Sequence, residues 1–130
     1  MGTEKVQEIT VTTPNDVGTM AKVFGIIAGA GVNVRSFMAH ASGNQGIFKL
    51  ITADNAKVVP LLEDAGLIVE QTEVVAVTCK DAMGAGADLG TKLGEAGINI
   101  DYTYATGTGS GEAVVVFAVD NAEKAAQVLG

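Results

Sequence analysis

The chain repeats its own pattern at a constant offset of 66 residues, and this repeat restricts its possible folds more than any other feature. The glycine before the first predicted helix, the glycine after it and the Asn that follows all recur, so that Gly18, Gly31 and Asn33 reappear as Gly84, Gly97 and Asn99. Matches at both ends of a helix, at one offset, indicate a duplicated structural unit. We therefore expect two similar domains in tandem, the first over residues 1–71 and the second over residues 72–130.

Apolar residues along the first copy alternate in some segments and recur every third or fourth residue in others, which predicts strands and helices respectively. The predicted order is strand, helix, strand, strand, helix, strand, at residues 6–12, 19–30, 32–39, 47–53, 56–65 and 67–70. The second copy repeats this order at residues 74–79, 83–96, 98–105, 113–119 and 122–130. No strand follows its last helix. We expect an α+β fold of two ferredoxin-like βαββαβ domains, each an antiparallel sheet with its helices on one face. The second copy lacks the last strand, which leaves either a truncated chain or an open sheet edge.

The composition excludes several classes of protein. The formal net charge of −7 opposes binding to nucleic acids and to anionic membranes. No apolar run approaches the roughly 20 residues that cross a bilayer, and no basic-then-apolar leader is present, so we expect a cytoplasmic protein. The single cysteine, Cys79, has no partner for a disulfide within the chain. No residue cluster indicates a metal or a cofactor, and no pair of acidic groups suits acid–base catalysis, so we expect no enzyme activity.

The residues around the two predicted turns resemble those of ACT domains, which are small modules that sense amino acids. The family pattern has Asp or Asn, any residue, Pro and Gly in the first turn, then a Leu-Ala-like helix start, then Gly-x-Asn-Ile. The first copy has Asn-Asp-Val-Gly at 15–18, Met-Ala at 20–21 and Gly-Val-Asn-Val at 31–34, and the second has Asp-Ala-Met-Gly at 81–84 and Gly-Ile-Asn-Ile at 97–100. The resemblance covers nearly the whole chain and is strongest to stand-alone tandem ACT proteins. The chain departs from the pattern in having Val17 and Met83 in place of Pro.

The resemblance implies a non-catalytic, allosteric regulator that binds a small amino acid where two ACT domains pair side by side. It also implies a homodimer, and as a further partner an enzyme or another protein that it regulates. In the family, the positions that match Asn15 and Asn33 often contact the ligand, and their second-copy counterparts are Asp81 and Asn99. The alternative is a structural or adaptor module that dimerises and binds no small molecule. The absent Pro residues and the absent last strand favour this alternative, whereas the retained Asn and Gly residues favour the sensor.

The residues of the first turn also suit an α-amino acid by their own chemistry. Backbone N–H groups at a helix N-terminus favour an anion such as the ligand carboxylate. An Asn side chain can both donate and accept, so it can bridge the groups of a zwitterion. The same polar residues can equally serve the backbone alone, as helix caps or at strand starts. The apolar neighbours suggest an aliphatic ligand side chain. The full predicted ligand-binding set is Asn15, Asp16, Val17, Gly18, Thr19, Met20, Asn33, Val34, Asp81, Met83, Gly84, Asn99 and Ile100.

Overall fold

The computed structural model describes residues 2–130, which fall into two compact units. The first unit comprises Gln7–Thr72, and the second comprises residues 73–130 together with residues 2–6. No helix in this described part of the chain has both the length and the apolar character needed to span a membrane.

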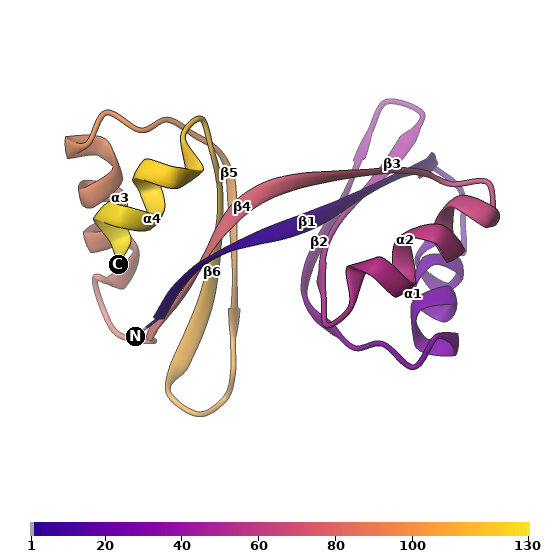
Figure 1. Cartoon of the computed structure of the whole chain (residues 1–130), viewed down its shortest axis with the longest axis horizontal. Coiled ribbons are helices and arrows are strands. Elements are labelled where there is room, and N and C mark those ends of the chain that lie inside the picture. The colour runs from indigo at the N-terminus through magenta and orange to yellow at the C-terminus, as the bar shows by residue number, and fades with distance from the viewer. Residues whose placement is uncertain (1) are drawn as a thin grey trace. The chain divides into compact units, whose positions relative to one another are not determined.

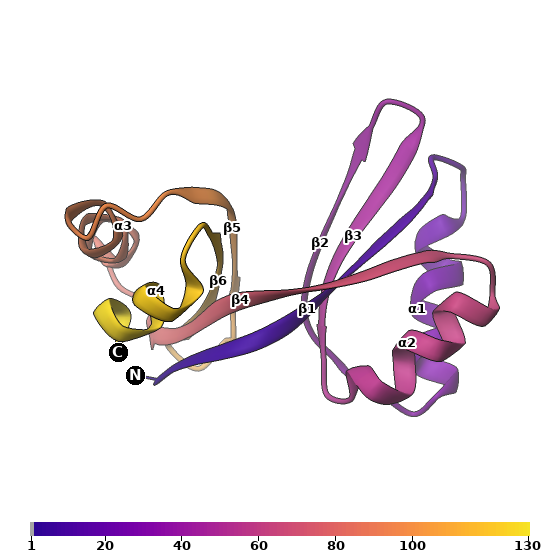
Figure 2. The ribbon, with the colours of Figure 1, turned by 45° about the horizontal axis from the view of Figure 1, so that its top comes forward.

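The first unit is a sheet with two helices on one face (Figure 1, Figure 2). Strand β3 pairs antiparallel with both β1 and β2, and β4 lies on the other side of β1, which gives the order β2-β3-β1-β4. The elements are β1 (Gly2–Pro14), α1 (Thr19–Gly29), β2 (Val34–Ser42), β3 (Gln45–Thr52), α2 (Asn55–Asp64) and β4 (Ile68–Lys80).

Each helix of the first unit presents to the sheet two apolar residues four positions apart, a spacing that places both on one helix face. These are Val23 and Ile27 of α1, and Val58 and Leu62 of α2, all of them buried. They pack with the alternate residues of the central strands, which are Ile9, Val11, Phe48 and Leu50. Full burial of each such side chain contributes about 1.5–3 kcal/mol. The core therefore forms between the helices and the sheet.

The second unit repeats this architecture with α3 (Ala85–Glu95), β5 (Ile100–Gly107), β6 (Glu112–Val119) and α4 (Ala122–Leu129). Strand β6 pairs antiparallel with β4 and β5. The buried helix residues again stand four apart, as Leu89 and Leu93 of α3 and as Ala125 and Leu129 of α4. They pack with Val75, Val77 and Phe117 of the sheet. The predicted α+β fold of two ferredoxin-like domains is confirmed.

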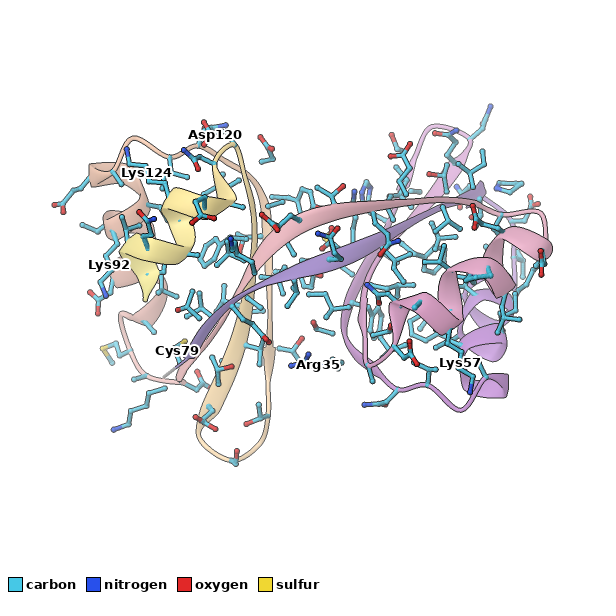
Figure 3. All side chains as sticks on the ribbon, in the orientation of Figure 1. Arg35, Lys57, Cys79, Lys92, Asp120 and Lys124 are labelled. Atoms are coloured by element: carbon cyan, nitrogen blue, oxygen red, sulfur yellow. The ribbon has the colours of Figure 1, made fainter. Side chains whose placement is uncertain are left out.

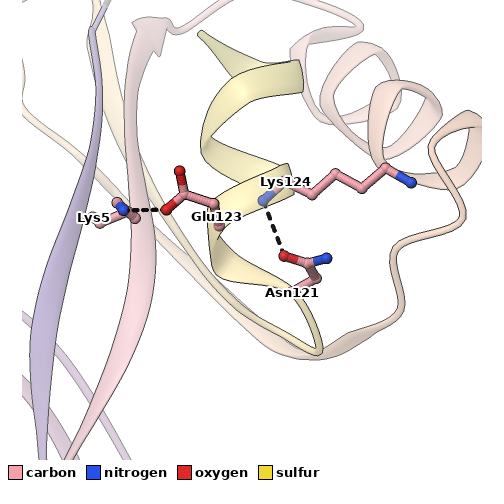
Figure 4. A network of polar contacts seen from close by, with 4 residues as sticks. All are labelled: Lys5, Asn121, Glu123 and Lys124. Carbon is pink, nitrogen blue, oxygen red and sulfur yellow. Dashed lines mark hydrogen bonds and ion pairs between the residues drawn. The ribbon is translucent and has the colours of Figure 1, made fainter.

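The N-terminal part of β1 belongs to the second unit and lies next to β4 there. The Thr3 hydroxyl donates to the Leu129 carbonyl at 3.0 Å, and the Lys5 ammonium pairs with the Glu123 carboxylate (Figure 4). The hydrogen bond to Lys5, and then its charge, lower the pKa of Glu123, and the same pair raises the pKa of Lys5. No strand follows α4, as expected, but the sheet edge beside β4 is occupied by residues 2–6. Residues 2–6 thus take the place of the last strand that the second copy lacks.

Strand β4 is one continuous strand of 13 residues. The sequence pattern predicts two separate strands here, at residues 67–70 and 74–79, and that division is wrong. Residues 68–72 form the last strand of the first unit, and residues 73–80 form the first strand of the second. Strand β1 is also divided between the units. Its residues 7–14 form the first strand of the first unit, and its residues 2–6 take the place of the last strand of the second. Because β4 contributes residues to both units, no linker is needed between them.

Asp-Asn pairs stand at the starts of α2 and α4, at residues 54–55 and 120–121, and a different member of each pair caps its helix. The Asp54 carboxylate accepts from the Lys57 N–H at 3.2 Å, whereas before α4 the Asn121 amide oxygen accepts from the Lys124 N–H at 3.0 Å (Figure 4). Both are ordinary N-cap bonds to the third helical residue. The residue type of a cap was therefore predictable here, but its position within the pair was not.

Candidate functional site

The turn between β1 and α1 is held against the hairpin that joins β2 to β3. Pro14 pairs with Gln45 at the end of the sheet. The Asn15 N–H then donates to the Asn44 carbonyl at 2.9 Å, and the Asp16 N–H donates to the Pro14 carbonyl at 3.0 Å. The backbone of the turn is thus fixed while the Asn15 and Asp16 side chains remain exposed. A fixed turn with exposed polar side chains suits a binding site.

Helix α1 begins without a side-chain cap. Its N-cap is Gly18, which has a φ of 88°, in the left-handed region that favours glycine. Within residues 2–130, no side chain accepts from the first N–H groups of α1, so Asn15 and Asp16 do not act as caps here. The Thr19 hydroxyl and N–H both donate to the Asp16 carbonyl, and the first helical bond is from the Lys22 N–H to the Gly18 carbonyl. The N–H groups of residues 20 and 21 are therefore the donors that the helix N-terminus presents.

A cavity of about 300 Å³ lies beside this turn. Five of the predicted residues line it together with residues of β1, β2 and β3. The lining is Thr13, Pro14, Asn15, Asp16, Gly18, Thr19, Met20, Ala39, His40, Ala41, Gly46 and Phe48. Val17 is not part of it, because its side chain is fully exposed at the tip of the turn and lines only a neighbouring cavity of about 240 Å³. The polar turn thus supplies one wall of the cavity and the sheet supplies the others.

Asn33 and Val34 lie at the opposite end of α1. The Asn33 carbonyl accepts from the Ala53 N–H at 3.0 Å, and Val34 pairs with Thr52 at the far end of β3. The 11 residues of α1 span about 16 Å at 1.5 Å per residue. Within one domain, Asn15 and Asn33 therefore cannot contact the same small ligand. The structure does not bring together the two halves of the predicted first-copy site.

The second turn repeats the backbone geometry of the first. The Asp81 N–H donates to the Gly111 carbonyl at 2.9 Å, and Gly84 is a left-handed N-cap with a φ of 82°. Asp81 and Ile100 line a cavity of about 500 Å³, and the fully exposed Met83 lines a smaller one of about 190 Å³. Gly84 lines neither of them.

Asn99 lies at the far end of α3, as Asn33 does on α1. The Asn99 backbone bonds to Asp120, with its N–H donating to the carboxylate and its carbonyl accepting from the N–H, each at 3.2 Å. Figure 3 shows Asp120 at that end of the domain and Cys79 near the end of β4. Asp81 and Asn99 are therefore also separated by the length of a helix.

The sequence analysis missed the cavity residues on β2 and β3, among them Ala39, His40 and Phe48. The cavity residues of β3, Gly46 and Phe48, alternate along the strand, whereas those of β2 are the consecutive residues 39–41. Both sets flank the turn between β2 and β3. Their closeness to Asn15 depends on the pairing of Pro14 with Gln45, which the order of strands alone does not specify. Among residues 2–130, no three His, Cys, Asp or Glu side chains cluster as a metal site would require.

The sequence and the fold were compared with those of known proteins. The model of the ACT domain pair matches residues 4–129. No curated protein matches the sequence. Among solved structures, protein BT0572 from Bacteroides thetaiotaomicron has a TM-score of 0.90 and 25% sequence identity, covering 98% of this chain and 88% of that one.

Two aspartate kinase structures share the fold at lower identity. The ligand-free regulatory subunit of aspartate kinase from Thermus thermophilus has a TM-score of 0.68 and 19% identity, over 99% of this chain and 95% of that one. Aspartokinase III of E. coli, in complex with aspartate and ADP, has a TM-score of 0.61 and 22% identity, over 98% of this chain and 31% of that one. At these identities the similarity concerns the fold.

Proposed function

Because this chain belongs to the ACT domain pair family, we propose that it is a non-catalytic allosteric regulator that binds a small amino acid. The binding site is the cavity beside the turn between β1 and α1 of the first domain. The ligand shifts the protein between two states by binding one of them more tightly. The regulated partner is an enzyme or another protein.

The observation that carries this proposal is the lining of the 300 Å³ cavity. One wall is a backbone-anchored polar turn with uncapped helix donors, and the opposite wall includes the apolar residues Ala39 and Phe48. Small-molecule sites combine a mostly apolar lining with a few well-placed polar groups, and begin at about 300 Å³. A cavity at that lower limit suits a small ligand.

The groups around the turn match those of an α-amino acid. The carboxylate is placed at the N–H groups of residues 20 and 21, where the helix dipole favours an anion. The ammonium is placed at the Asp16 carboxylate or the Asn15 amide oxygen, both of which accept. An aliphatic ligand side chain then contacts Met20, which is half exposed in the free protein.

We further propose that the protein acts as a homodimer, because Asn33 lies too far from Asn15 to share a ligand with it in one domain. A side-by-side arrangement lets Asn33 of a second copy approach the turn of the first. This arrangement is the one that the family implies. It would use Asn15 and Asn33 together without any change in either domain.

The test is thermal unfolding of the purified protein with each of the twenty amino acids. A ligand at about 100 times its Kd adds about 2.7 kcal/mol to the free energy of unfolding. We expect a rise in Tm that is selective for one class of small amino acid, and that both Asn15→Ala and Asn33→Ala abolish. Asn44→Ala is the matched control, because Asn44 is exposed in the adjacent hairpin and does not line the cavity.

Mixing the two variants tests the homodimer. If the site is shared between chains, Asn15→Ala and Asn33→Ala chains together should form mixed dimers in which one site is intact, and part of the Tm shift should return. No shift with any amino acid at millimolar concentration would refute free amino-acid binding. A shift lost only with Asn99→Ala would place the site in the second domain.

One observation favours the alternative of a dimerisation module without a ligand. Val17 and Met83 occupy equivalent positions at the tips of the two turns, and both side chains are fully exposed. Repeated, exposed apolar side chains are typical of contact surfaces. If Val17→Ser and Met83→Ser together convert a dimer into a monomer while no amino acid raises the Tm, the alternative is the better account.

A further inference from the structure

The second domain contains a groove of about 500 Å³ between α3 and the helix-facing side of β5 and β6. Its floor is formed by Cys79, Leu89 and Phe117, which are 4–5% exposed. Gly86 and Gly90 of α3 form one side, and Thr103 and Ala105 of β5 form the other. The groove lies wholly within this domain.

Three phenylalanines fill the corresponding space in the first domain. The rings of Phe24 and Phe37 meet edge to face with centroids 4.8 Å apart, and those of Phe24 and Phe48 with centroids 6.5 Å apart. Phe24 comes from α1, Phe37 from β2 and Phe48 from β3. The cavity that remains beside them is the 300 Å³ site of the first turn.

The second domain has small residues at all three positions. The helix offset of 66 places Gly90 where α1 has Phe24. Thr103 is the equivalent of Phe37, because each lies on the edge strand opposite a core residue of the next strand. Thr103 pairs with Phe117, and Phe37 pairs with Leu50.

Val115 takes the place of the third ring, because it pairs with Val77 as Phe48 pairs with Val11. A fourth replacement also removes side-chain volume from this space, since Gly86 is at the position where the first domain has Met20.

The vacated space has not been refilled by neighbouring atoms. A Cβ added at Gly86 or at Gly90 would meet no atom within 4 Å. Two glycines inside a helix also cost about 0.5–1 kcal/mol each relative to alanine. The groove is thus kept open at a cost in stability, and no neighbouring atom occupies the space that side chains at positions 86 and 90 would take.

We propose that this groove binds a small molecule with a compact aromatic body of one or two fused rings. The occupant follows from the first domain, where aromatic rings fill the same space between equivalent walls. An apolar cavity of about 150 Å³ is enough to hold benzene, so 500 Å³ accommodates a larger ring system. Lys80 and Asp81 line one end of the groove, where a polar substituent of the ligand meets water and charge.

This proposal is independent of the amino-acid site in the first domain. It concerns another domain, another wall chemistry and another class of ligand. If no amino acid binds at the first turn, the aromatic groove is unaffected.

Indole is a suitable probe, because it has two fused rings and no charge. We expect a titration followed by ¹H–¹⁵N NMR to shift amide signals of α3 and β5, with saturation at about 1 mM or below. Signals of α1 and β2 should stay in place, since the phenylalanines fill their groove. Gly90→Phe should weaken indole binding about tenfold or more by placing a ring in the groove.

Gly94→Phe is the matched control. It makes the same change on the same helix, but Gly94 does not line the groove and an added Cβ there meets nothing. It should leave indole affinity within about twofold. If Gly90→Phe does not fold, Thr103→Phe on the exposed edge strand tests the same point.

Three results would overturn the proposal. The first is the absence of shifts in the second domain at millimolar indole, and the second is equal weakening by the position 90 and position 94 variants. The third is a set of α3 and β5 shifts that depends on protein concentration without indole, which would indicate that a second copy of the chain covers the groove.

Discussion

Replacing Thr3 by valine should loosen the second domain and leave the first unchanged. The Thr3 hydroxyl donates to the carbonyl of Leu129 at 3.0 Å. That carbonyl belongs to the last turn of α4, where carbonyl groups have no partner within the helix. A residue near the start of the chain therefore satisfies the end of its last helix, and Thr3→Val removes that bond while nearly preserving shape.

The expected effect is about 0.5–1.5 kcal/mol, the usual net contribution of one hydrogen bond. At the middle of that range the opening equilibrium of the segment changes about fivefold. Amide hydrogen exchange measures it directly, because local opening sets the exchange rate of each amide. Exchange should speed up in α4 and in residues 74–79 of β4, and remain the same in α1 and α2.

Thr12→Val is the matched control for this experiment. Thr12 lies on the same strand, in the part that belongs to the first unit, and its hydroxyl is in no hydrogen bond of the described residues. It should not change exchange in α4. Unchanged exchange in α4 for Thr3→Val, or an equal change in all four helices, would refute the assignment of residues 2–6 to the second domain.

Three further substitutions test other features. Gly18→Ala should lower the free energy of unfolding by about 1–2 kcal/mol, because Gly18 has a left-handed backbone conformation. Gly25→Ala, inside α1 with open space around it, should raise the free energy of unfolding by about 0.5–1 kcal/mol. Denaturant titrations in which both variants change the free energy of unfolding in the same direction would contradict this. Lys124→Met should weaken the end of α3 by about 0.3–1 kcal/mol, since the ammonium donates to the carbonyl of the C-cap residue Ala96 at 2.7 Å. Faster amide exchange confined to residues 93–97 is the expected result. Glu123→Gln should have its full effect on stability between about pH 5 and pH 10, and a progressively smaller effect below and above that range. The hydrogen bond and charge of Lys5 lower the pKa of Glu123, so the contribution is lost as the pH falls through that lowered value, and as it rises through the raised pKa of Lys5. A stability difference that grows in acid would contradict the pairing.

The repeat was sufficient to predict the fold because the same physical constraint acts twice. Glycines that end a helix and apolar residues four apart specify a helix on a sheet, and both recur at the same offset. The location of residues 2–6 was not predictable from this pattern. A short alternating segment indicates a strand but not its neighbour, and the deciding contacts of Thr3 and Lys5 are with residues more than 110 positions away.

The candidate site was predicted in part for a related reason. Residues 15–20 are local in the sequence, so the turn that holds them was visible as a motif. Asn33 was grouped with them because it belongs to the same motif, but a helix separates the two ends of that motif in space. The two parts of the motif therefore lie at opposite ends of one domain. They can form a single site only if one end of a domain meets the other end of a second domain.

The shared strands also determine the order in which this protein can be completed. Residues 2–6 are synthesised before their partners in the second domain, which are at residues 73–80 and 123–129. The first domain can close its helices and inner strands once residue 72 has been made. Residues 2–6 can pair with β4 only after residues 73–80 are made, and can contact α4 only after residues 123–129 are made. Contacts this far apart in sequence are slow to form, because a long loop must close before they stabilise anything. Residues 2–6 consequently remain an unpaired strand edge until these partners have been made, and this interval is when the nascent protein is most prone to associate with other chains.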